Sequence, residues 1–457
     1  MQNKLNEPLL ASSETGRRDK ENSVPGVPVP PATKVSKYVS EKIKLLTLFG
    51  IICVVYTHSY NGYPRLMQPD STYYPVTGGV AVEYFLVGSA LRWAVPMFFL
   101  FSGYLFFIHK PADLTGGFQF KRRIVARMKS VLLPYLLWNI IGYFLVVFVY
   151  QIPGVQARWP WFQDFLRPTS SLLIGKLIYP IPYPLWYLRD LFLIVLMSPM
   201  FYHLHRCRLL LPYVGFAFAI WMQNKWPLQL QWLCGDGEWC PNVSILDMDG
   251  LLFFPIGAAM ALNSSNVDVK VSTRTWGVKF MLPFFIINIT KVLLATFDAA
   301  PAIRLLLYKT GIPFGLGAVW YGYDKVYDRG WKGKGSLNWL AQFPMWIYCA
   351  HEPMLGATLE NIQPLLGMGK IVHLGQLTAP NASDVQHCEH TAESIWFFVL
   401  YVLFSALWVA FLVLVGHGLA KFMPRVFSVL TGGRGPKKRN IATELPNIPP
   451  KLSLEEA

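Results

Sequence analysis

The chain has 457 residues, of which 53% are hydrophobic and only 15% carry a charge. Because a soluble domain has roughly a quarter charged residues, this composition excludes a globular protein with a water-exposed surface. The net charge of +15 suggests a nucleic acid as partner, but the basic residues recur in alternate loops instead of gathering with aromatic residues on one face. The sequence therefore predicts no nucleic-acid partner and an all-α, polytopic membrane helix bundle.

Ten apolar stretches are separated by charged or Pro- and Gly-rich breaks. Since a helix needs about 20 mostly apolar residues to cross a bilayer, each stretch is predicted to be a transmembrane span. The expected spans are 45–60, 82–108, 131–150, 186–203, 209–224, 248–263, 277–297, 305–323, 337–357 and 394–418.

Two tails flank the predicted membrane domain, 41–420. We expect a disordered cytosolic tail over 1–40 and a basic cytosolic tail over 421–457. With the N-terminus inside, the tails and every second loop hold most of the 41 Lys and Arg residues but fewer than half of the 26 Asp and Glu residues. Cytosolic loops of membrane proteins carry this positive excess. The sequence therefore predicts about ten helices with both tails in the cytosol.

The first span ends in His58. An ionisable side chain in a span indicates a functional site, and the alternative is an interfacial histidine whose ring reaches water. Imidazole titrates near neutral pH, so it can take a hydroxyl proton and return it. In the second span the always-charged Arg92 must face protein or water. It belongs either to a site or to a buried ion pair, with Glu83 or a carboxylate of another helix.

The segment from Lys121 to Lys129 carries a dense run of cations before the third span. These side chains can hold the phosphates of a nucleotide-tailed donor, but positive-inside topology explains them equally without any ligand. In the fourth span Arg189 and Asp190 are adjacent in sequence. We expect them to point to different helix faces and to find separate partners.

A second histidine, His351, ends the ninth predicted span. Lys44 and Ser336 mark the cytosolic ends of the two helices. From the helical rise per residue, His58 and His351 each lie roughly 21–23 Å from those ends. The two rings are therefore predicted at matching depth, where they can share one cavity. The cluster 387–390 in the last outer loop, His-Cys-Glu-His, lacks the second half of a metal site, so no metal is expected.

The order of these motifs resembles the acyltransferase-3 family of polytopic membrane acyltransferases, in particular its surface-polysaccharide O-acyltransferase branch. The matching pieces are His58-Ser59, Arg92-x-x-Val95-Pro96-x-Phe98-Phe99-x-x-Ser102-Gly103-Tyr104, the basic run ending at Pro134-Tyr135, Pro184-Leu185-Trp186-Tyr187-Leu188, Phe253-Phe254-x-Ile256-Gly257 and Ile347-Tyr348-x-x-His351-x-Pro353.

The resemblance implies an enzyme that takes an acyl group, usually acetyl, from cytosolic acyl-CoA and delivers it to a hydroxyl group of a carbohydrate or glycolipid. Acyl-CoA is then a co-substrate, and no permanently bound cofactor is implied. The resemblance marks His58 as essential. Our hypothesis is that His58 is the base and that Arg92 or His351 steadies the oxyanion or orients the base. Arg123 and Arg127 become candidate donor-binding residues.

Lys121 and Lys44 are further candidates for the donor phosphates. The family commonly has Arg or Lys eleven positions before the first-helix histidine, where this chain has Thr47, with Lys44 one turn earlier. Lys44 either substitutes for that cation or the donor contact is altered. Two rival functions stay open from the sequence: a transporter or acyl-group translocator without its own chemistry, and a receptor or scaffold whose histidines sense pH.

Overall fold

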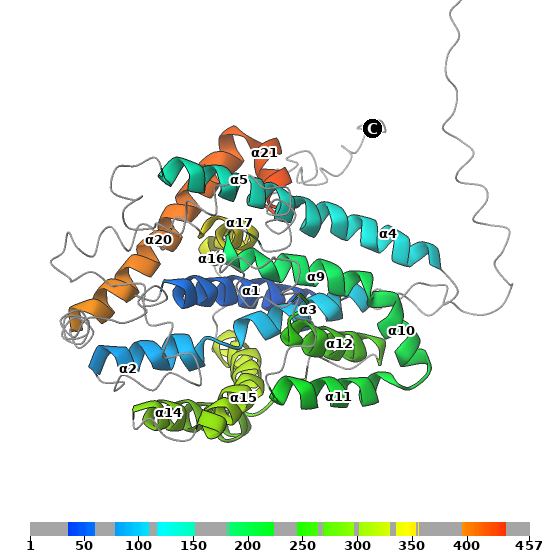
Figure 1. The fold of residues 1–457 in the computed structure, drawn as a ribbon. Helices are drawn as coiled ribbons and strands as arrows, with labels where there is room; N and C mark the ends of the chain where they lie inside the picture. The colour runs from blue at the N-terminus through cyan, green and yellow to red at the C-terminus, as the bar shows by residue number, and fades with distance from the viewer. Residues whose placement is uncertain are drawn as a thin grey trace, which may run out of the picture.

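The computed structural model describes residues 35–59, 78–108, 117–150, 180, 182–223, 245–263, 267, 269–296, 301–329, 335–352, 355 and 395–435. All regular elements within these ranges are helical, which confirms the expected all-α class there (Figure 1). Residues 1–34, the loop cluster 387–390 and the end of the C-terminal tail lie outside the described residues.

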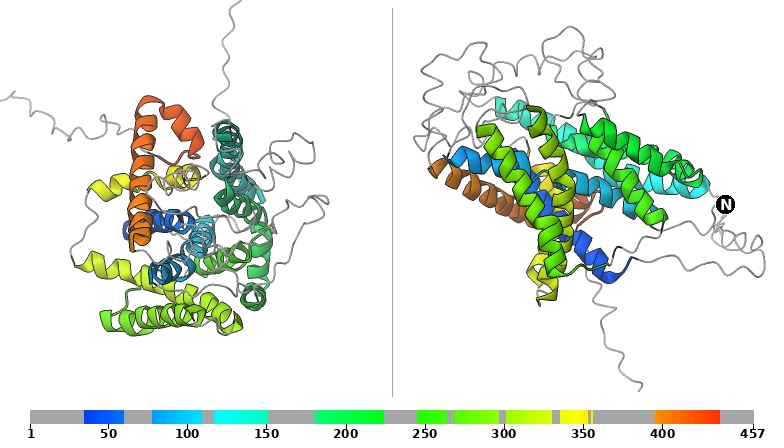
Figure 2. Two further views of the ribbon diagram at one scale, coloured as in Figure 1. Left: turned by 60° about the vertical axis from the view of Figure 1, so that its left-hand side comes forward. Right: turned by 90° about the horizontal axis from the view of Figure 1, so that it is seen from below.

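The helices lie around α1 (Lys37–His58), which starts after Ser36, whose hydroxyl accepts from the Val39 N–H. The other helices are α2 (Gly78–Phe85), η3 (Leu86–Ala90), α3 (Ala94–Phe107), α4 (Gly117–Arg127), η4 (Met128–Leu132), α5 (Leu133–Tyr150), η5 (Tyr183–Leu185), α9 (Trp186–Leu196), α10 (Ser198–Arg206), α11 (Leu210–Met222), α12 (Met248–Leu262), α13 (Thr273–Trp276), η7 (Gly277–Met281), α14 (Leu282–Thr296), α15 (Pro301–Asp328), α16 (Gly335–Leu340), α17 (Pro344–Ala350), α20 (Ile395–Phe422) and α21 (Pro424–Leu430). Figures 1 and 2 show α20 and α14–α15 on opposite sides of α1.

The long apolar helices are those of a multi-pass integral membrane protein. Within the described residues, five helices are long and apolar enough to cross a bilayer: Ala81–Phe107, Phe120–Leu145, Thr273–Ala295, Ala302–Asp328 and Phe398–Phe422. The pair α9 and α10, bent by 47°, makes a sixth if it is one span. The expected span 337–357 is instead divided between the short helices α16 and α17, because residues 341–343 form a turn.

Two glycines bring α3 and α12 into backbone contact. A Cβ on Gly103 would meet the Phe254 carbonyl oxygen at 2.1 Å, and a Cβ on Gly257 would meet that of Leu100 at 2.1 Å. Small residues let membrane helices approach backbone to backbone, and here each helix contributes one. This reciprocal contact explains why both sequence motifs contain glycine.

Gly257→Ala is expected to destabilise the protein by about 1–3 kcal/mol, because the added methyl must push two backbones apart. Gly215→Ala in α11 is the matched control, since a Cβ there meets nothing within 4 Å. Denaturant unfolding in detergent measures the free energy of unfolding of both purified variants. Equal stability of the two variants would contradict the close contact.

A buried ion pair joins α1 to α15. Lys42 Nζ lies 2.6 Å from Asp324 Oδ1, and both side chains are 1% exposed. The ammonium also lies 3.8 Å from the centroid of the Trp320 ring, and the Tyr38 hydroxyl donates to the same carboxylate oxygen. Burial of both charges requires such pairing, so this contact fixes the register of α1 against α15.

Candidate active site

The two histidines meet at the ends of α1 and α17. The ring centroids of His58 and His351 are 5.4 Å apart, as the matching depths predicted. His351 is fully buried, and its Nδ1 lies 2.8 Å from the Tyr348 carbonyl oxygen. A carbonyl only accepts, so Nδ1 carries a proton, and in the neutral ring Nε2 is the nitrogen that can accept one. Nε2 has no hydrogen-bond partner among the described residues.

Contacts with α20 hold the end of α1 in place. The fully buried Ser59 donates to the Val55 carbonyl at 2.6 Å, and Ser405 Oγ lies 2.7 Å from Ser59 Oγ. The hydroxyl of Tyr401 donates to the Tyr56 carbonyl at 3.0 Å. These contacts position His58, which remains partly exposed. Sequence reasoning found Ser59 but missed its partners on α20, which are about 345 residues distant in the chain.

Arg92 follows a π-helical turn, η3, that breaks its span. Its Nε donates to the Val87 carbonyl at 2.7 Å, within that turn. Such turns recur at functional sites because they change the face on which the following side chains emerge. The Arg92 guanidinium acts electrostatically on the His58 ring, and the ring of Tyr183 lies 6.2 Å from that of His58. Arg92 therefore belongs to the surroundings of the histidine pair.

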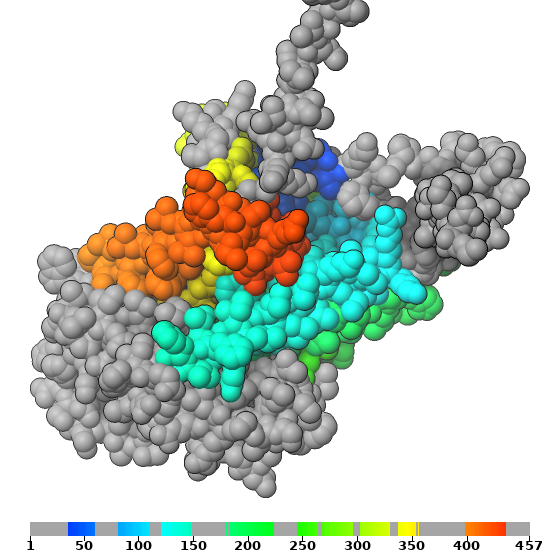
Figure 3. Space-filling view, turned by 90° about the horizontal axis from the view of Figure 1, so that it is seen from above, coloured from blue at the N-terminus to red at the C-terminus, as the bar shows by residue number. Residues whose placement is uncertain are grey.

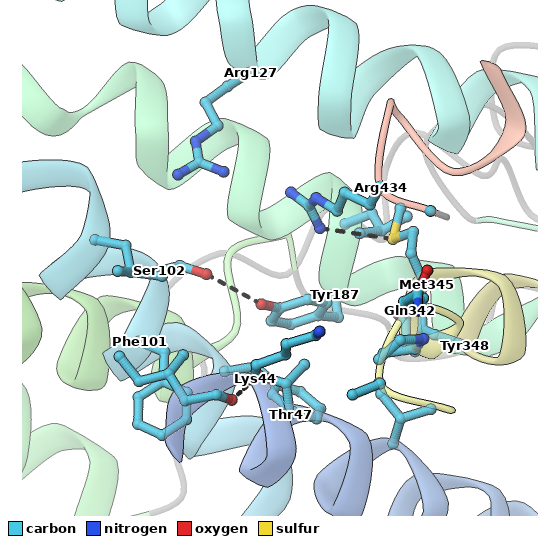
Figure 4. Close-up of a pocket in the computed structure, with 18 residues that line it drawn as sticks. Lys44, Thr47, Phe101, Ser102, Arg127, Tyr187, Gln342, Met345, Tyr348 and Arg434 are labelled. Carbon is cyan, nitrogen blue, oxygen red and sulfur yellow. Dashed lines mark hydrogen bonds between the residues drawn. The ribbon is translucent and has the colours of Figure 1, made fainter. Parts of the chain in front are cut away.

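A cavity of about 610 Å³ lies between α1, α3, α9 and α17 (Figure 4). It is lined by Ile43, Lys44, Thr47, Ile51, Phe98, Phe101, Ser102, Leu105, Arg127, Tyr187, Leu188, Ala341, Gln342, Pro344, Met345, Tyr348, Arg434 and Gly435. The guanidinium groups of Arg127 and Arg434 and the ammonium of Lys44 enter it from different elements. The cavity thus has both cationic and apolar walls.

The basic run divides between cavity and surface. Arg127 lines the cavity, whereas Arg123, one turn earlier, is partly buried and donates to the Phe106 carbonyl. Lys121 is exposed and does not line the cavity. Residues four apart lie on the same helix face. This spacing explains why Arg123 and Arg127 are partly buried, as is Ile124, whereas the other cations of the run are exposed.

The position of the missing family cation lies on the same cavity wall. Thr47 lines the cavity, and its hydroxyl donates to the Ile43 carbonyl at 2.7 Å. Lys44 presents its ammonium to that cavity and lies 3.4 Å from the Asn338 carbonyl oxygen. Thr47 and Lys44 therefore lie on the same cavity wall, one helical turn apart.

The expectation that Arg189 and Asp190 point apart and do not pair with each other was wrong. Arg189 Nε lies 2.7 Å from Asp190 Oδ1, and both side chains are buried. A long arginine side chain can fold back along its helix, and burial favours pairing with the nearest carboxylate. Asp190 Oδ2 also accepts from the Asp247 N–H at 2.7 Å, so this pair holds the start of α12.

The cavity stops short of the histidines. Tyr187 and Tyr348 line it, but neither His58 nor His351 does. The rings of Tyr348 and His351 lie 6.1 Å apart, and Ile51 precedes His58 by two helical turns, about 10 Å along α1. A flexible ligand arm in the cavity is therefore separated from the imidazoles by one layer of aromatic rings.

A family model described as an acyltransferase domain matches residues 41–415. The chain belongs to the acyltransferase-3 family. Members of this family are acyl-transferring enzymes, and the match covers the histidine pair, Arg92 and the cavity wall up to Tyr348. Arg434 and Gly435 of the cavity wall lie beyond it.

The chain is also similar to the succinoglycan biosynthesis protein ExoH of Rhizobium meliloti (strain 1021). The two chains are 31% identical over 166 residues, which is 35% of this chain and 42% of that protein. No solved structure matches the chain. Within the described residues, no group of three or more His, Cys, Asp or Glu side chains is placed to hold a metal ion.

Proposed function

We propose that the protein is a membrane-embedded O-acyltransferase that moves an acyl group, acetyl above all, from acyl-CoA to a hydroxyl group of a carbohydrate or glycolipid. The observation that carries the proposal is the histidine pair, 5.4 Å between ring centroids, beside a cavity with a cationic wall. The name of the succinoglycan biosynthesis relative supports a polysaccharide or its precursor as acceptor.

In this mechanism His58 is the general base. Its imidazole takes the proton of the acceptor hydroxyl, whose oxygen attacks the thioester carbonyl carbon. The C–S bond then breaks, and the proton passes to the departing CoA thiolate. Arg92 stabilises the charge on the carbonyl oxygen, and His351 orients the base from its fixed place against the Tyr348 carbonyl.

The donor phosphates need cations, which the cavity and its rim supply. Lys44 and Arg127 line the cavity, which supports a role for both in binding phosphate. Arg123 lies one turn from Arg127, and Lys121 stands on the exposed face, where it raises the local positive potential. The pantetheine arm then extends along α1 toward the ring layer at Tyr348.

We further propose that the chain crosses the membrane ten times with both tails in the cytosol. The proposal is supported by helices within each expected range, among them α1, the short apolar helices α11 and α12, and α17. The positive-inside distribution supports this orientation, which puts the basic end of the cavity on the cytosolic side, where acyl-CoA is found.

Purified protein supplied with labelled acetyl-CoA and a panel of mono- and oligosaccharides is expected to form a labelled, alkali-labile ester on one of them. Release of free CoA must match the ester formed, because each transfer breaks one thioester. A protein that flips a lipid-linked sugar in liposomes and consumes no acyl-CoA would instead be a translocator, and the proposal would be wrong.

A further inference from the structure

The end of the described chain contributes to the cavity from outside the family domain. The family match ends at residue 415, whereas Arg434 and Gly435 line the cavity. Figure 4 shows the Arg434 guanidinium in the same space as Arg127. Arg434 therefore reaches the cavity because of the local structure that precedes it in the chain.

A glycine turn ends α21 and sets the direction of Arg434. Gly432 and Gly433 have φ values of +63° and +78°, the left-handed region that favours glycine. The Gly433 N–H donates to the Ser428 carbonyl at 2.7 Å, which caps the last turn of α21. Buried Thr431 donates to the Phe427 carbonyl at 2.7 Å. The chain therefore leaves α21 along one defined path.

Close packing fixes α21 against α4–α5 and α17. A Cβ on Gly432 would meet the Ser130 carbonyl oxygen at 2.4 Å, within η4 and three residues after Arg127. Trp138 Nε1 donates to the Leu430 carbonyl at 3.0 Å, and buried Phe427 lies 5.7 Å from the Trp346 ring. Figure 3 shows the red-orange C-terminal helices against the cyan α4–α5. Arg434 is thereby held close to Arg127.

Two guanidinium groups then face one cavity. Arg434 and Arg127 act on each other electrostatically, and like charges so placed repel. Arg434 Nη1 contacts Met345 Sδ at 3.8 Å, and a thioether is a weak acceptor. Lys44 adds a third cation from α1. An anion with several oxygens would relieve this repulsion and provide strong, charge-assisted hydrogen bonds.

We propose that Arg434 is a donor-binding residue that grips the phosphates of the acyl-CoA nucleotide together with Arg127 and Lys44. This inference rests on the proposed function. If Arg434 has this role, the segment after the family domain is part of the substrate site. The glycine turn at the end of α21 then positions the Arg434 guanidinium.

Two acyl donors, one with phosphates and one without, distinguish phosphate binding by Arg434 from a purely structural role of this residue. S-acetylpantetheine carries the thioester but no phosphate, so it is the matched probe for acetyl-CoA. Arg434→Gln is expected to raise the KM for acetyl-CoA by about ten- to hundredfold and to leave the KM for S-acetylpantetheine unchanged. Arg434→Lys keeps the charge and is expected to recover part of the loss. Arg425→Gln, on the exposed side of α21, is the control and is expected to match the unmodified protein.

Binding of CoA to the purified protein, measured by calorimetry, adds a readout that needs no turnover. Weaker CoA binding by Arg434→Gln supports the inference even if no transfer is found, in which case the proposed function alone fails. An unchanged KM and affinity, or equal losses with both donors, overturns the inference. Absence of CoA binding by the unmodified protein overturns both.

Discussion

His58→Ala is expected to slow acyl transfer by about 10²- to 10⁴-fold, because the substitution removes the group that takes the hydroxyl proton. The end of α1 keeps its contacts with α20 through Ser59 and Tyr56, so the variant is expected to insert and fold. Single-turnover transfer from labelled acetyl-CoA measures the chemical step, and gel filtration in detergent checks the fold.

A second imidazole of the bundle gives the matched control. His417 lies on α20 with its ring 5.4 Å from that of Trp339, away from the histidine pair. His417→Ala is expected to retain transfer. If His58→Ala turned over as fast as this control, His58 would not be the base, and the proposed mechanism would fail.

Asp324→Ala is expected to destabilise the protein by about 3–5 kcal/mol, because it leaves the Lys42 ammonium buried without its anionic partner. Replacing both residues by apolar ones of similar size, Lys42→Met with Asp324→Leu, is expected to restore most of the loss. Denaturant unfolding in detergent compares the three proteins.

An exposed ion pair of the same geometry is the control for Asp324. Lys270 Nζ also lies 2.6 Å from Asp328 Oδ1, but these side chains are 45% and 46% exposed. Water and salt screen such a pair, so Asp328→Ala is expected to change stability little. Equal losses for Asp324→Ala and Asp328→Ala would show that burial is not what makes the first pair important.

The sequence predicted the features that depend on local pattern. Apolar runs gave the helical class, and counting residues along two helices placed His58 and His351 at one depth, which their observed contact matches. The sequence also indicates which cations of the basic run share a helix face, because Arg123 and Arg127 are four residues apart. Their roles in donor binding stay a prediction.

Features that depend on contacts between distant segments were missed. Lys42 and Asp324 are 282 residues apart, and nothing in the local sequence marks them as partners. Arg434 reads as one more cation of a basic tail, because its direction depends on the packing of Gly432 against Ser130. The pairing of Arg189 with Asp190 was misjudged because helix-face geometry says little about a long side chain that folds back.

The ring layer at Tyr187 and Tyr348 has a consequence for the membrane itself. A hydrated ion that enters at the basic end meets packed aromatic side chains before it reaches His351, and the described residues that line the cavity stop there. Apolar side chains and ring edges are poor substitutes for the water shell of an ion. In the proposed mechanism only the slender thioester arm passes this layer to reach the alcohol at His58, so transfer does not require a water-filled path through the bundle.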